Sequence, residues 1–298
     1  MSETSRRHWR LSGERTVQLD PCCLMGILNA TPDSFSDGGD HLDAEAAATA
    51  GRAMVRAGAG ILDVGGESTR PGAERVPVAE QIERVVPVVR ALRRDAETAG
   101  VAITVDTTRA AVAEAAIEAG ADAINDVSAG LEDDSMFDLA ARLGVGIVLM
   151  HRLRPPDEDV YSDRYTRPPA YEDVVDEVEA FLEGRAVAAE AAGVRPDSIV
   201  VDPGLGFGKS VEQNLEILRR IDEFGRRGRL VLAGASRKSF LGAIAGRTDP
   251  RDRLIESVVA GVEAVRRGAA ILRVHDVEPH ARAIRVLAAV GSRAPAAG

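Results

Sequence analysis

The chain has 298 residues, of which 45% are hydrophobic and only 3% aromatic, and its formal net charge at pH 7 is −10. This length suits one (β/α)₈ domain with an aliphatic core, and the negative charge argues against a general nucleic-acid surface. The N-terminal segment is polar, and no stretch reaches about 18 consecutive apolar residues. We therefore expect a cytoplasmic protein that binds neither nucleic acid nor membrane.

Short apolar runs alternate along the chain with stretches that have helical character. Strands are predicted at 23–29, 60–64, 101–106, 123–127, 146–150, 198–202, 230–233 and 270–274. Helices are predicted at about 44–57, 78–98, 110–119, 171–192, 211–221, 252–267 and 279–289. This alternation predicts a single-domain α/β fold, a (β/α)₈ TIM barrel over residues 21–290. Residues 1–20 are then an N-terminal extension, and residues 291–298 a disordered tail.

Most of the apolar runs end in a polar residue. Because parallel strands of a barrel point the same way, these endings should meet at one rim, where barrel enzymes keep their chemistry. An alternative for Asp106 or Asp126 alone is that its carboxylate caps the next helix. The spread of the endings over all the strands favours a site. The endings are Asn29, Asp63, Asp106, Asn125, His151, Asp202, Ser236 and Arg273.

Two long loops follow the first two predicted strands. Residues 29–39 read Asn-Ala-Thr-Pro-Asp-Ser-Phe-Ser-Asp-Gly-Gly, a run of turn formers and oxygen ligands that favours a lid over an ordinary surface turn. Residues 65–72 read Gly-Gly-Glu-Ser-Thr-Arg-Pro-Gly, in which the glycines allow backbone to approach a ligand. Arg70 offers a planar fork that suits a carboxylate or phosphate, although a solvated arginine on a flexible loop is the alternative.

The Gly-rich segment 202–210 matches neither of two familiar phosphate-binding motifs. A Walker A loop would need glycine where Pro203 stands, and a dinucleotide fingerprint would need glycine where Lys209 stands. What remains is a Gly-rich turn that holds Asp202 at the rim and places Phe207 beside it.

The last two predicted strands end in segments that suit an anion. A nucleophile elbow would need glycine at Lys238, so covalent catalysis there is not expected. Loops at this place in a barrel often bind anions through N–H groups at a helix start, which Ser236 could also cap. Arg273 and His275 alternate to the same side of their strand, and two cationic or donor groups there suit a diphosphate. The alternative for His275 is a structural histidine.

Together these motifs resemble one family, dihydropteroate synthase of folate biosynthesis. The resemblance runs from about Met25 to Val290 and covers, in order, both loops, Val-Asp-Thr, Ile-Asn-Asp-Val, Leu-Met-His, Asp-Pro-Gly-x-Gly-Phe-Gly-Lys, Ser-Arg-Lys and Arg-Val-His-Asp-Val. It implies a transferase that joins 7,8-dihydropterin-6-ylmethyl diphosphate to 4-aminobenzoate and releases diphosphate and 7,8-dihydropteroate.

The resemblance also implies a role for each matched residue. Contacts to the pterin diphosphate would come from Thr69, Asp106, Asn125, Met150, Asp202, Lys238, Arg273 and His275. Contacts to 4-aminobenzoate would come from Arg70, Pro71, Phe207 and Ser236. The catalytic residues would be Lys238, Arg273, His275 and Asp106, and Asn29 would hold the cofactor Mg²⁺. Loops 30–40 and 65–76 would close over the substrates, and the family is commonly homodimeric, which implies a homodimer.

One block departs from the family's pattern. Many members continue Met-His with Met-Gln-Gly, whereas here Met150-His151 is followed by Arg-Leu-Arg-Pro-Pro and a long acidic and aromatic segment. We name residues 152–169 the excursion. Two other functions are weighed against the transferase. A methyltetrahydrofolate-binding domain of a corrinoid-dependent methyltransferase would have no use for the Ser-Arg-Lys and Arg-Val-His blocks. A paralogue that binds pterins without turnover is kept open by the altered loop.

Overall fold

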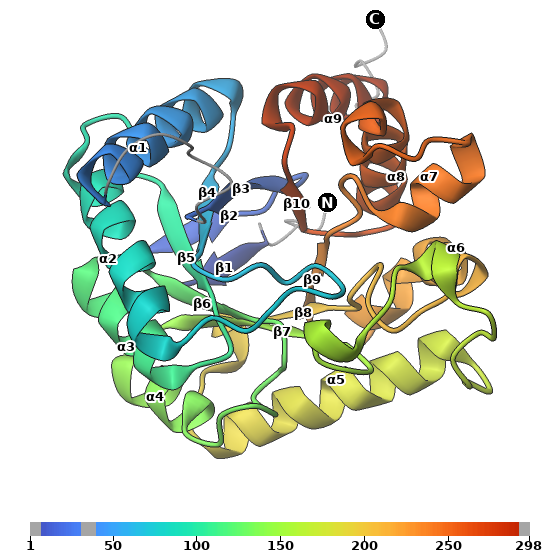
Figure 1. The fold of residues 1–298 in the computed structure, drawn as a ribbon, viewed down its shortest axis with the longest axis horizontal. Helices are drawn as coiled ribbons and strands as arrows, with labels where there is room; N and C mark the ends of the chain where they lie inside the picture. The colour runs from blue at the N-terminus through green and yellow to red at the C-terminus, as the bar shows by residue number, and fades with distance from the viewer. Residues whose placement is uncertain (1–6, 31–39, 292–298) are drawn as a thin grey trace, which may run out of the picture.

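Eight parallel strands close into a barrel in the computed structural model, which describes residues 7–30 and 40–291 (Figure 1). Around the barrel the strands follow the order β10-β3-β4-β5-β6-β7-β8-β9. Their bounds are Cys23–Asn29 (β3), Ile61–Gly65 (β4), Ala102–Asp106 (β5), Ala123–Asp126 (β6), Gly146–Met150 (β7), Ile199–Asp202 (β8), Leu230–Ala233 (β9) and Ile271–Val274 (β10). The predicted (β/α)₈ barrel is therefore confirmed.

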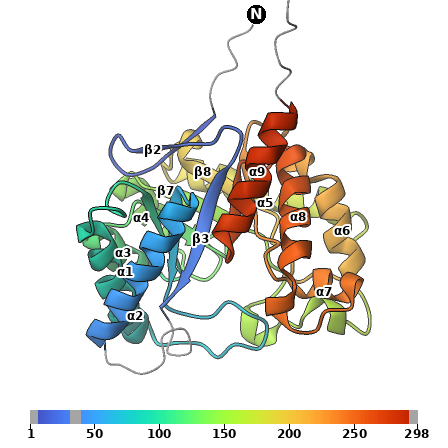
Figure 2. The same cartoon turned by 90° about the horizontal axis from the view of Figure 1, so that it is seen from above.

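Helices surround the barrel and connect its strands (Figures 1 and 2). Their bounds are Asp40–Ala57 (α1), Val78–Arg94 (α2), Ala110–Ala119 (α3), Met136–Leu143 (α4), Val174–Ala191 (α5), Val211–Arg219 (α6), Ser239–Ala245 (α7), Leu254–Arg266 (α8) and Val277–Gly291 (α9). Each predicted helix is present, with ends that differ from the prediction by a few residues. Gly120 takes a left-handed conformation at the end of α3, the helix stop that its position predicts.

Three described elements were not predicted. The helix α4 carries its buried side chains at Met136, Phe137, Leu139 and Ala140, a short helical pattern that the sequence does contain. The helix α7 has only seven residues and includes Gly242, so it has no clear period. The third element is an antiparallel hairpin of β1 (His8–Arg10) and β2 (Thr16–Gln18), which lies within the polar N-terminal extension.

This hairpin covers the N-terminal end of the barrel. Trp9 and Leu11 are fully buried there, in one cluster with inward-facing strand residues such as Met25 and Ile61. The indole N–H of Trp9 donates a 2.9 Å hydrogen bond to the carbonyl of Ser198. Figure 2 shows the hairpin at one end of the barrel and the loop between β4 and α2 at the other. One end of the barrel is thus filled with apolar side chains, which leaves the opposite rim for polar ones.

The parts of the chain outside the described residues include most of the predicted lid, residues 31–39, and residues 292–298 of the expected disordered tail. The first residue of that expected tail, Gly291, ends α9. In the described ranges, no helix is long and apolar enough to cross a membrane.

Candidate active site

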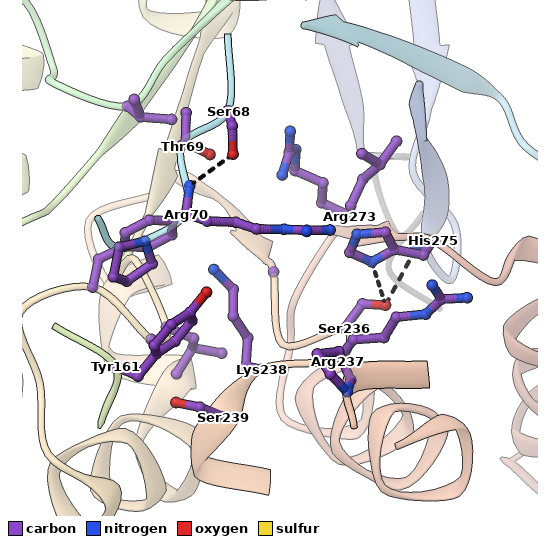
Figure 3. A pocket seen from close by; sticks show the side chains of 18 of the residues that line it. Ser68, Thr69, Arg70, Tyr161, Ser236, Arg237, Lys238, Ser239, Arg273 and His275 are labelled. Carbon is purple, nitrogen blue, oxygen red and sulfur yellow. Dashed lines mark hydrogen bonds between the residues drawn. The ribbon is translucent and has the colours of Figure 1, made fainter. Parts of the chain in front are cut away.

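A cavity of about 410 Å³ lies at the C-terminal ends of the barrel strands (Figure 3). The prediction that distant strand endings meet at one rim is confirmed, because almost every candidate residue lines this one cavity. These residues are Asn29, Thr69, Arg70, Pro71, Asn125, Met150, Asp202, Phe207, Ser236, Lys238, Arg273 and His275. Three of the predicted strand endings, Asp63, Asp106 and His151, are outside the lining. Asp63 and Asp106 contact the lining residue Arg273.

Arg273 is held between two buried carboxylates. Its Nε donates to Asp63 Oδ2 and its Nη2 donates to Asp106 Oδ2, both at 2.6 Å. These carboxylates belong to β4 and β5, whereas Arg273 belongs to β10, so the side chain crosses the barrel interior. Against the lowering effect of burial, Asp63 and Asp106 raise the pKa of Arg273, which is therefore charged. The pairing fixes the direction of the guanidinium group at the base of the cavity.

Asp63 is the residue whose role the sequence did not reveal beyond its position at a strand ending. It is fully buried, and both of its oxygens accept hydrogen bonds. Besides Arg273, it accepts from Thr104 Oγ1 at 2.5 Å and from Asn125 Nδ2 at 3.0 Å. Asp63 thus orients Asn125 and Arg273, which both face the cavity. A polar residue inside an otherwise apolar strand was the signal for such a role.

Asp106 has one carboxylate oxygen that is used and one that is not. Oδ2 is bonded to Arg273, whereas Oδ1 is buried and has no hydrogen-bond partner among residues 7–30 and 40–291. Burial raises the pKa of Asp106 and the charge of Asp63 adds to the rise, while Arg273 opposes it. Capping of the next helix is not its role, because α3 begins after Arg109 without a side-chain cap.

Asp126 serves the backbone of its own turn. Its carboxylate accepts from the N–H and hydroxyl of Ser128 and from the N–H of Gly130. The cavity lining does not include Asp126. Asp126 therefore stabilises its own turn and does not cap the next helix, because α4 has Ser135 at its N-cap position. Asp106 belongs instead to the ion cluster of Asp63, Asp106 and Arg273.

Asp202 stands at the rim on the turn that the sequence predicted. Its Oδ1 accepts a 2.7 Å hydrogen bond from the N–H of Gly204, and Phe207 lines the cavity nearby. Burial raises the pKa of Asp202 to about 6, although Gly204, Lys238 and Arg273 favour the charged form. Gly234 lies between Asp202 and Arg273: a Cβ there would be 3.9 Å from Asp202 Oδ2 and 4.0 Å from Arg273 Cβ. The Asp202 carboxylate and the Arg273 side chain are thus neighbours.

A buried lysine stabilises the turn after Asp202 through hydrogen bonds. Lys209 is fully buried, and its Nζ contacts His151 Nδ1 at 2.9 Å and the carbonyls of Gly204 and Phe207 at 3.1 and 2.9 Å. Burial and the charge of Lys209 lower the pKa of His151 to about 2, so the imidazole is neutral and accepts this hydrogen bond. Gly204 has to be glycine, because a Cβ would lie 1.9 Å from the carbonyl oxygen of His151. His151 therefore supports the rim rather than facing the cavity.

Lys238 and Arg70 supply positive charge to the cavity. Neither side chain has a salt-bridge partner within the described part of the chain, and Figure 3 shows Arg70 extending over the cavity from its loop. Lys238 Nζ lies 3.7 Å from the centre of the Phe207 ring, a cation–π contact. Burial and the charge of Arg273 lower the pKa of Lys238 to about 7, while Asp202 opposes the shift. Lys238 is therefore able to hold or release a proton near neutral pH.

Ser236 and His275 form a pair on the other side of the cavity. Ser236 Oγ lies 3.1 Å from His275 Nδ1 and accepts the backbone N–H of His275 at 3.2 Å. Burial and the charges of Arg237 and Arg273 lower the pKa of His275 to about 3, so this histidine is a neutral hydrogen-bonding group and not a cation. The expectation that Ser236 caps a helix is wrong, because α7 begins at Ser239 and has Lys238 at its N-cap position.

Several further lining residues were not singled out by the sequence analysis, Tyr161 and Ser239 among them. Tyr161 comes from the excursion, and Ser239 is the first residue of α7. Tyr161 lies in the segment where the sequence departs from the pattern of many family members, so the resemblance did not place it at the rim. Ser239 follows directly on the Ser-Arg-Lys block, which was the available signal.

The fold and the cavity define a (β/α)₈-barrel protein with an enzyme-like site, in which carboxylate and amide groups face a set of cations. Residues 25–275 match the pterin binding enzyme family, and the chain belongs to that family. It is similar to a dihydropteroate synthase from Synechocystis sp., with 42% identity over 264 residues that cover 88% of each chain.

Two more similarities extend this comparison. A probable bifunctional folylpolyglutamate synthase/dihydropteroate synthase from Haloferax volcanii is 45% identical over 276 residues; these cover 93% of this chain but only 31% of that longer protein. The solved structure of Xanthomonas albilineans dihydropteroate synthase with 4-aminobenzoic acid superposes with a TM-score of 0.87 at 41% identity. That superposition covers 97% of this chain and 100% of the other.

The ion cluster yields a stability prediction. Replacement of Asp63 by alanine leaves the buried donors of Arg273, Asn125 and Thr104 without their acceptor, so the free energy of unfolding should fall by about 3–5 kcal/mol. Asp63→Asn, which keeps the size and one acceptor oxygen, should recover part of the loss. Chemical denaturation followed by circular dichroism measures both variants.

The matched control is Glu97→Gln, which weakens a bidentate pair with Arg56 of similar geometry on the exposed surface. This change should have little effect, because solvent screens exposed pairs. If Asp63→Ala and Glu97→Gln unfolded at the same denaturant midpoint, the cluster of Asp63, Asp106 and Arg273 would have no structural role.

Proposed function

We propose that this protein is a dihydropteroate synthase, a transferase that joins 7,8-dihydropterin-6-ylmethyl diphosphate to 4-aminobenzoate in folate biosynthesis. The observation that carries the proposal is one cavity that combines a carboxylate and amide side with a cationic side, in a chain of the pterin binding enzyme family. The two sides correspond to the two chemically different halves of a pterin diphosphate.

The pterin ring would bind on the carboxylate and amide side. A pterin edge presents adjacent N–H donors, which a carboxylate accepts in pairs, and the unpaired Oδ1 of Asp106 is a further acceptor. Asp202 and Asn125 line this side together with Met150, which offers an apolar surface for the ring. Because unmatched buried polar groups are costly, such a site would select strongly for the ring.

The diphosphate would bind on the cationic side. Arg273 uses two of its five N–H donors for Asp63 and Asp106, so three remain for phosphate oxygens while the ion cluster stays intact. The neutral imidazole of His275 would act as a hydrogen-bond donor, and Thr69 lines the same cavity. Positive charge at this place would stabilise the diphosphate as it leaves.

The reaction would be a substitution in which departure of the diphosphate runs ahead of attack by the amine. The C–O bond to the diphosphate breaks, the leaving group takes the electron pair, and the amine nitrogen of 4-aminobenzoate forms the new C–N bond and loses one proton. The carbon between them carries a resonance-stabilised cation as the bond breaks. An aromatic amine is neutral near pH 7, so it attacks without a strong base. Lys238, with a pKa of about 7, is suited to taking up the released proton.

The 4-aminobenzoate would lie between the cationic side and the loop after β4. Arg70, Pro71 and Phe207 would shape this part of the cavity, with Arg70 pairing with the carboxylate. The Xanthomonas albilineans structure that superposes on this chain contains 4-aminobenzoic acid. The assignment of Ser236 to this substrate is less favoured by its contacts, which are with His275 on the diphosphate side.

Mg²⁺ would be held by Asn29. Within residues 7–30 and 40–291, no cluster of three or more His, Cys, Asp or Glu side chains has the geometry of a metal site. Asn29 offers one amide oxygen in the cavity lining, which fits a cation that takes most of its ligands from substrate phosphates and water. When bound, Mg²⁺ would offset charge on the diphosphate.

The protein would form a homodimer through an apolar surface on the outside of the barrel. Ile255 and Val259 on α8 are 75% and 63% exposed and lie one helical turn apart, and Val286 and Val290 on the neighbouring helix α9 are 64% and 80% exposed. Figure 2 shows the two helices side by side on the outside of the barrel. Exposed apolar side chains on adjacent helices are typical of a subunit interface. A cytoplasmic location remains a prediction.

Turnover tests the proposed function directly. Purified protein incubated with the pterin diphosphate, 4-aminobenzoate and Mg²⁺ should release diphosphate only when all three are present. A coupled phosphate assay measures the release, and chromatography identifies dihydropteroate. Pterin binding without release would favour the non-catalytic paralogue, and methyl transfer from methyltetrahydrofolate would favour the methyltransferase.

Binding of a pterin should depend on pH through Asp202. Its pKa of about 6 lies above the usual value, and the protonated carboxyl is a poor acceptor for ring N–H groups, so affinity should fall as pH drops through about 6. Below this value the loss should approach about tenfold per pH unit. Calorimetry with a pterin analogue lacking the diphosphate measures it. Asp202→Asn should bind the analogue weakly, with an affinity that does not change with pH. If its affinity depended on pH as in wild type, Asp202 would not be the group whose titration controls pterin binding.

The proposed interface predicts a concentration-dependent mass. Wild-type protein should sediment as a dimer, and Val259→Asp should shift it toward a monomer because a charge would be buried between subunits. Val187→Asp places the same charge on α5, at a residue that is 52% exposed, and should leave the dimer intact. A wild-type monomer at all concentrations tested would argue against the assembly.

A further inference from the structure

The excursion, residues 152–169, is the long segment that the proposed function does not use. It crosses the rim and is bonded to loops from three other parts of the barrel. Its Pro156 carbonyl accepts the N–H of Gly72 at 2.7 Å, next to the loop residues Arg70 and Pro71. The buried Asp159 accepts the N–H of Gly208 at 2.9 Å, beside Phe207. The excursion is therefore part of the wall around the cavity.

A second pair of contacts fixes the middle of the excursion. The N–H of Ser162 donates to Ser239 Oγ at 3.1 Å, and Ser162 Oγ accepts from Asn214 Nδ2 at 3.1 Å. Ser162, Ser239 and Asn214 are all buried. Tyr161 lies directly before Ser162 and two residues after Asp159, so its backbone is held on both sides.

Tyr161 is the residue that the excursion contributes to the cavity. Its side chain is half-buried and lines the cavity with Arg70, Phe207, Lys238 and Ser239. Figure 3 shows its ring below Arg70, with the hydroxyl end directed into the cavity on the side of Lys238. Two aromatic rings, those of Tyr161 and Phe207, thus meet two basic side chains, those of Arg70 and Lys238. Neither basic side chain has a carboxylate partner among the described residues. This combination suits a flat aromatic carboxylate.

We propose that Tyr161 is a specificity-determining residue for the aromatic acceptor substrate. Its ring forms the outer wall of the acceptor part of the cavity, and its hydroxyl donates a hydrogen bond to the acceptor's carboxylate. The identity of this acceptor, 4-aminobenzoate, rests on the proposed function. Tyr161 lies in the segment where the sequence departs from the Met-Gln-Gly pattern of many family members, so the resemblance did not assign it this contact.

Steady-state kinetics with Tyr161→Phe tests the hydrogen bond. Loss of a hydrogen bond to a charged group should raise KM for 4-aminobenzoate about tenfold, with KM for the pterin diphosphate and kcat changed by no more than about twofold. With 4-aminobenzamide, which lacks the charge, wild type and Tyr161→Phe should have similar KM values. Unchanged KM for 4-aminobenzoate, or an equal rise for both acceptors, would overturn the hydroxyl contact.

Kinetics with Tyr161→Ala test whether the Tyr161 ring limits the length of the acceptor. Removal of the ring should narrow the preference for 4-aminobenzoate over the longer acceptor 4-aminobenzoylglycine, because the cavity gains room beyond the carboxylate. The control is Val160→Ala, which truncates an exposed neighbour in the same segment that is outside the cavity lining and should match wild type. If Tyr161→Ala kept the wild-type preference for 4-aminobenzoate over 4-aminobenzoylglycine, the Tyr161 ring would not form the outer wall of the acceptor site.

Different results would contradict the proposed function and the role of Tyr161. Wild-type protein without 4-aminobenzoate-dependent diphosphate release would contradict the proposed function. Normal wild-type turnover with unaffected Tyr161 variants would contradict only the role of Tyr161. If Tyr161→Ala fails to fold, Tyr161→Phe still decides the hydroxyl contact, because it keeps the packed ring.

Discussion

Arg273 reaches from β10 across the barrel interior to Asp63 on β4 and Asp106 on β5, strands with which β10 shares no ladder of backbone hydrogen bonds. Removal of three charges from water costs several kcal/mol for each ion, and only well-formed hydrogen bonds offset such a cost. Asp63 meets this condition because both of its oxygens are used. The cluster can therefore persist only if the barrel is closed and in this register. In return, it sets the direction of the Arg273 guanidinium group and leaves Oδ1 of Asp106 without a hydrogen-bond partner among the described residues.

The cluster is possible because the two ends of the barrel differ. The N-terminal end is filled with aliphatic residues and covered by the hairpin, where Trp9 and Leu11 are fully buried. Side chains that point inward alternate along each strand, so the same strands present aliphatic residues at this end and polar ones two or four residues later. On β4, for example, Ile61 belongs to the apolar cluster and Asp63 to the ion cluster. A closely packed base gives the polar rim a rigid support, which suits a mechanism that depends on positioned charges.

Much of this arrangement was predictable because parallel strands carry strong local signals. Buried aliphatic runs that end in Asp, Asn or Arg identify both the barrel and its active rim, which is why Asp202 and Arg273 were correctly expected at one cavity. The local signal fails where a role depends on a partner distant in sequence. Asp63 and Arg273 are 210 residues apart, and no pattern in the sequence pairs them. The burial that makes His275 neutral and the contact that joins Ser236 to it were also invisible, since both arise from packing.

The excursion is fixed to the barrel rim by a carboxylate that bonds several loops at once. Glu132, in the loop after β6, accepts bidentate hydrogen bonds from Arg75 at 2.6 and 2.8 Å and one from Thr108 at 2.8 Å, and it also pairs with Arg152 of the excursion. Despite burial, which raises it, the pKa of Glu132 is held at about 2 by Arg75, Thr108 and Arg152. The carboxylate therefore stays charged at neutral pH and joins the loops after β4, β5, β6 and β7. Since one of these loops carries Arg70 and another carries Tyr161, Glu132 connects both lining residues to the excursion through fixed contacts. If Arg70 and Tyr161 bind the acceptor as proposed, a sequence change in the excursion would alter which acceptor fits without changing the ion cluster.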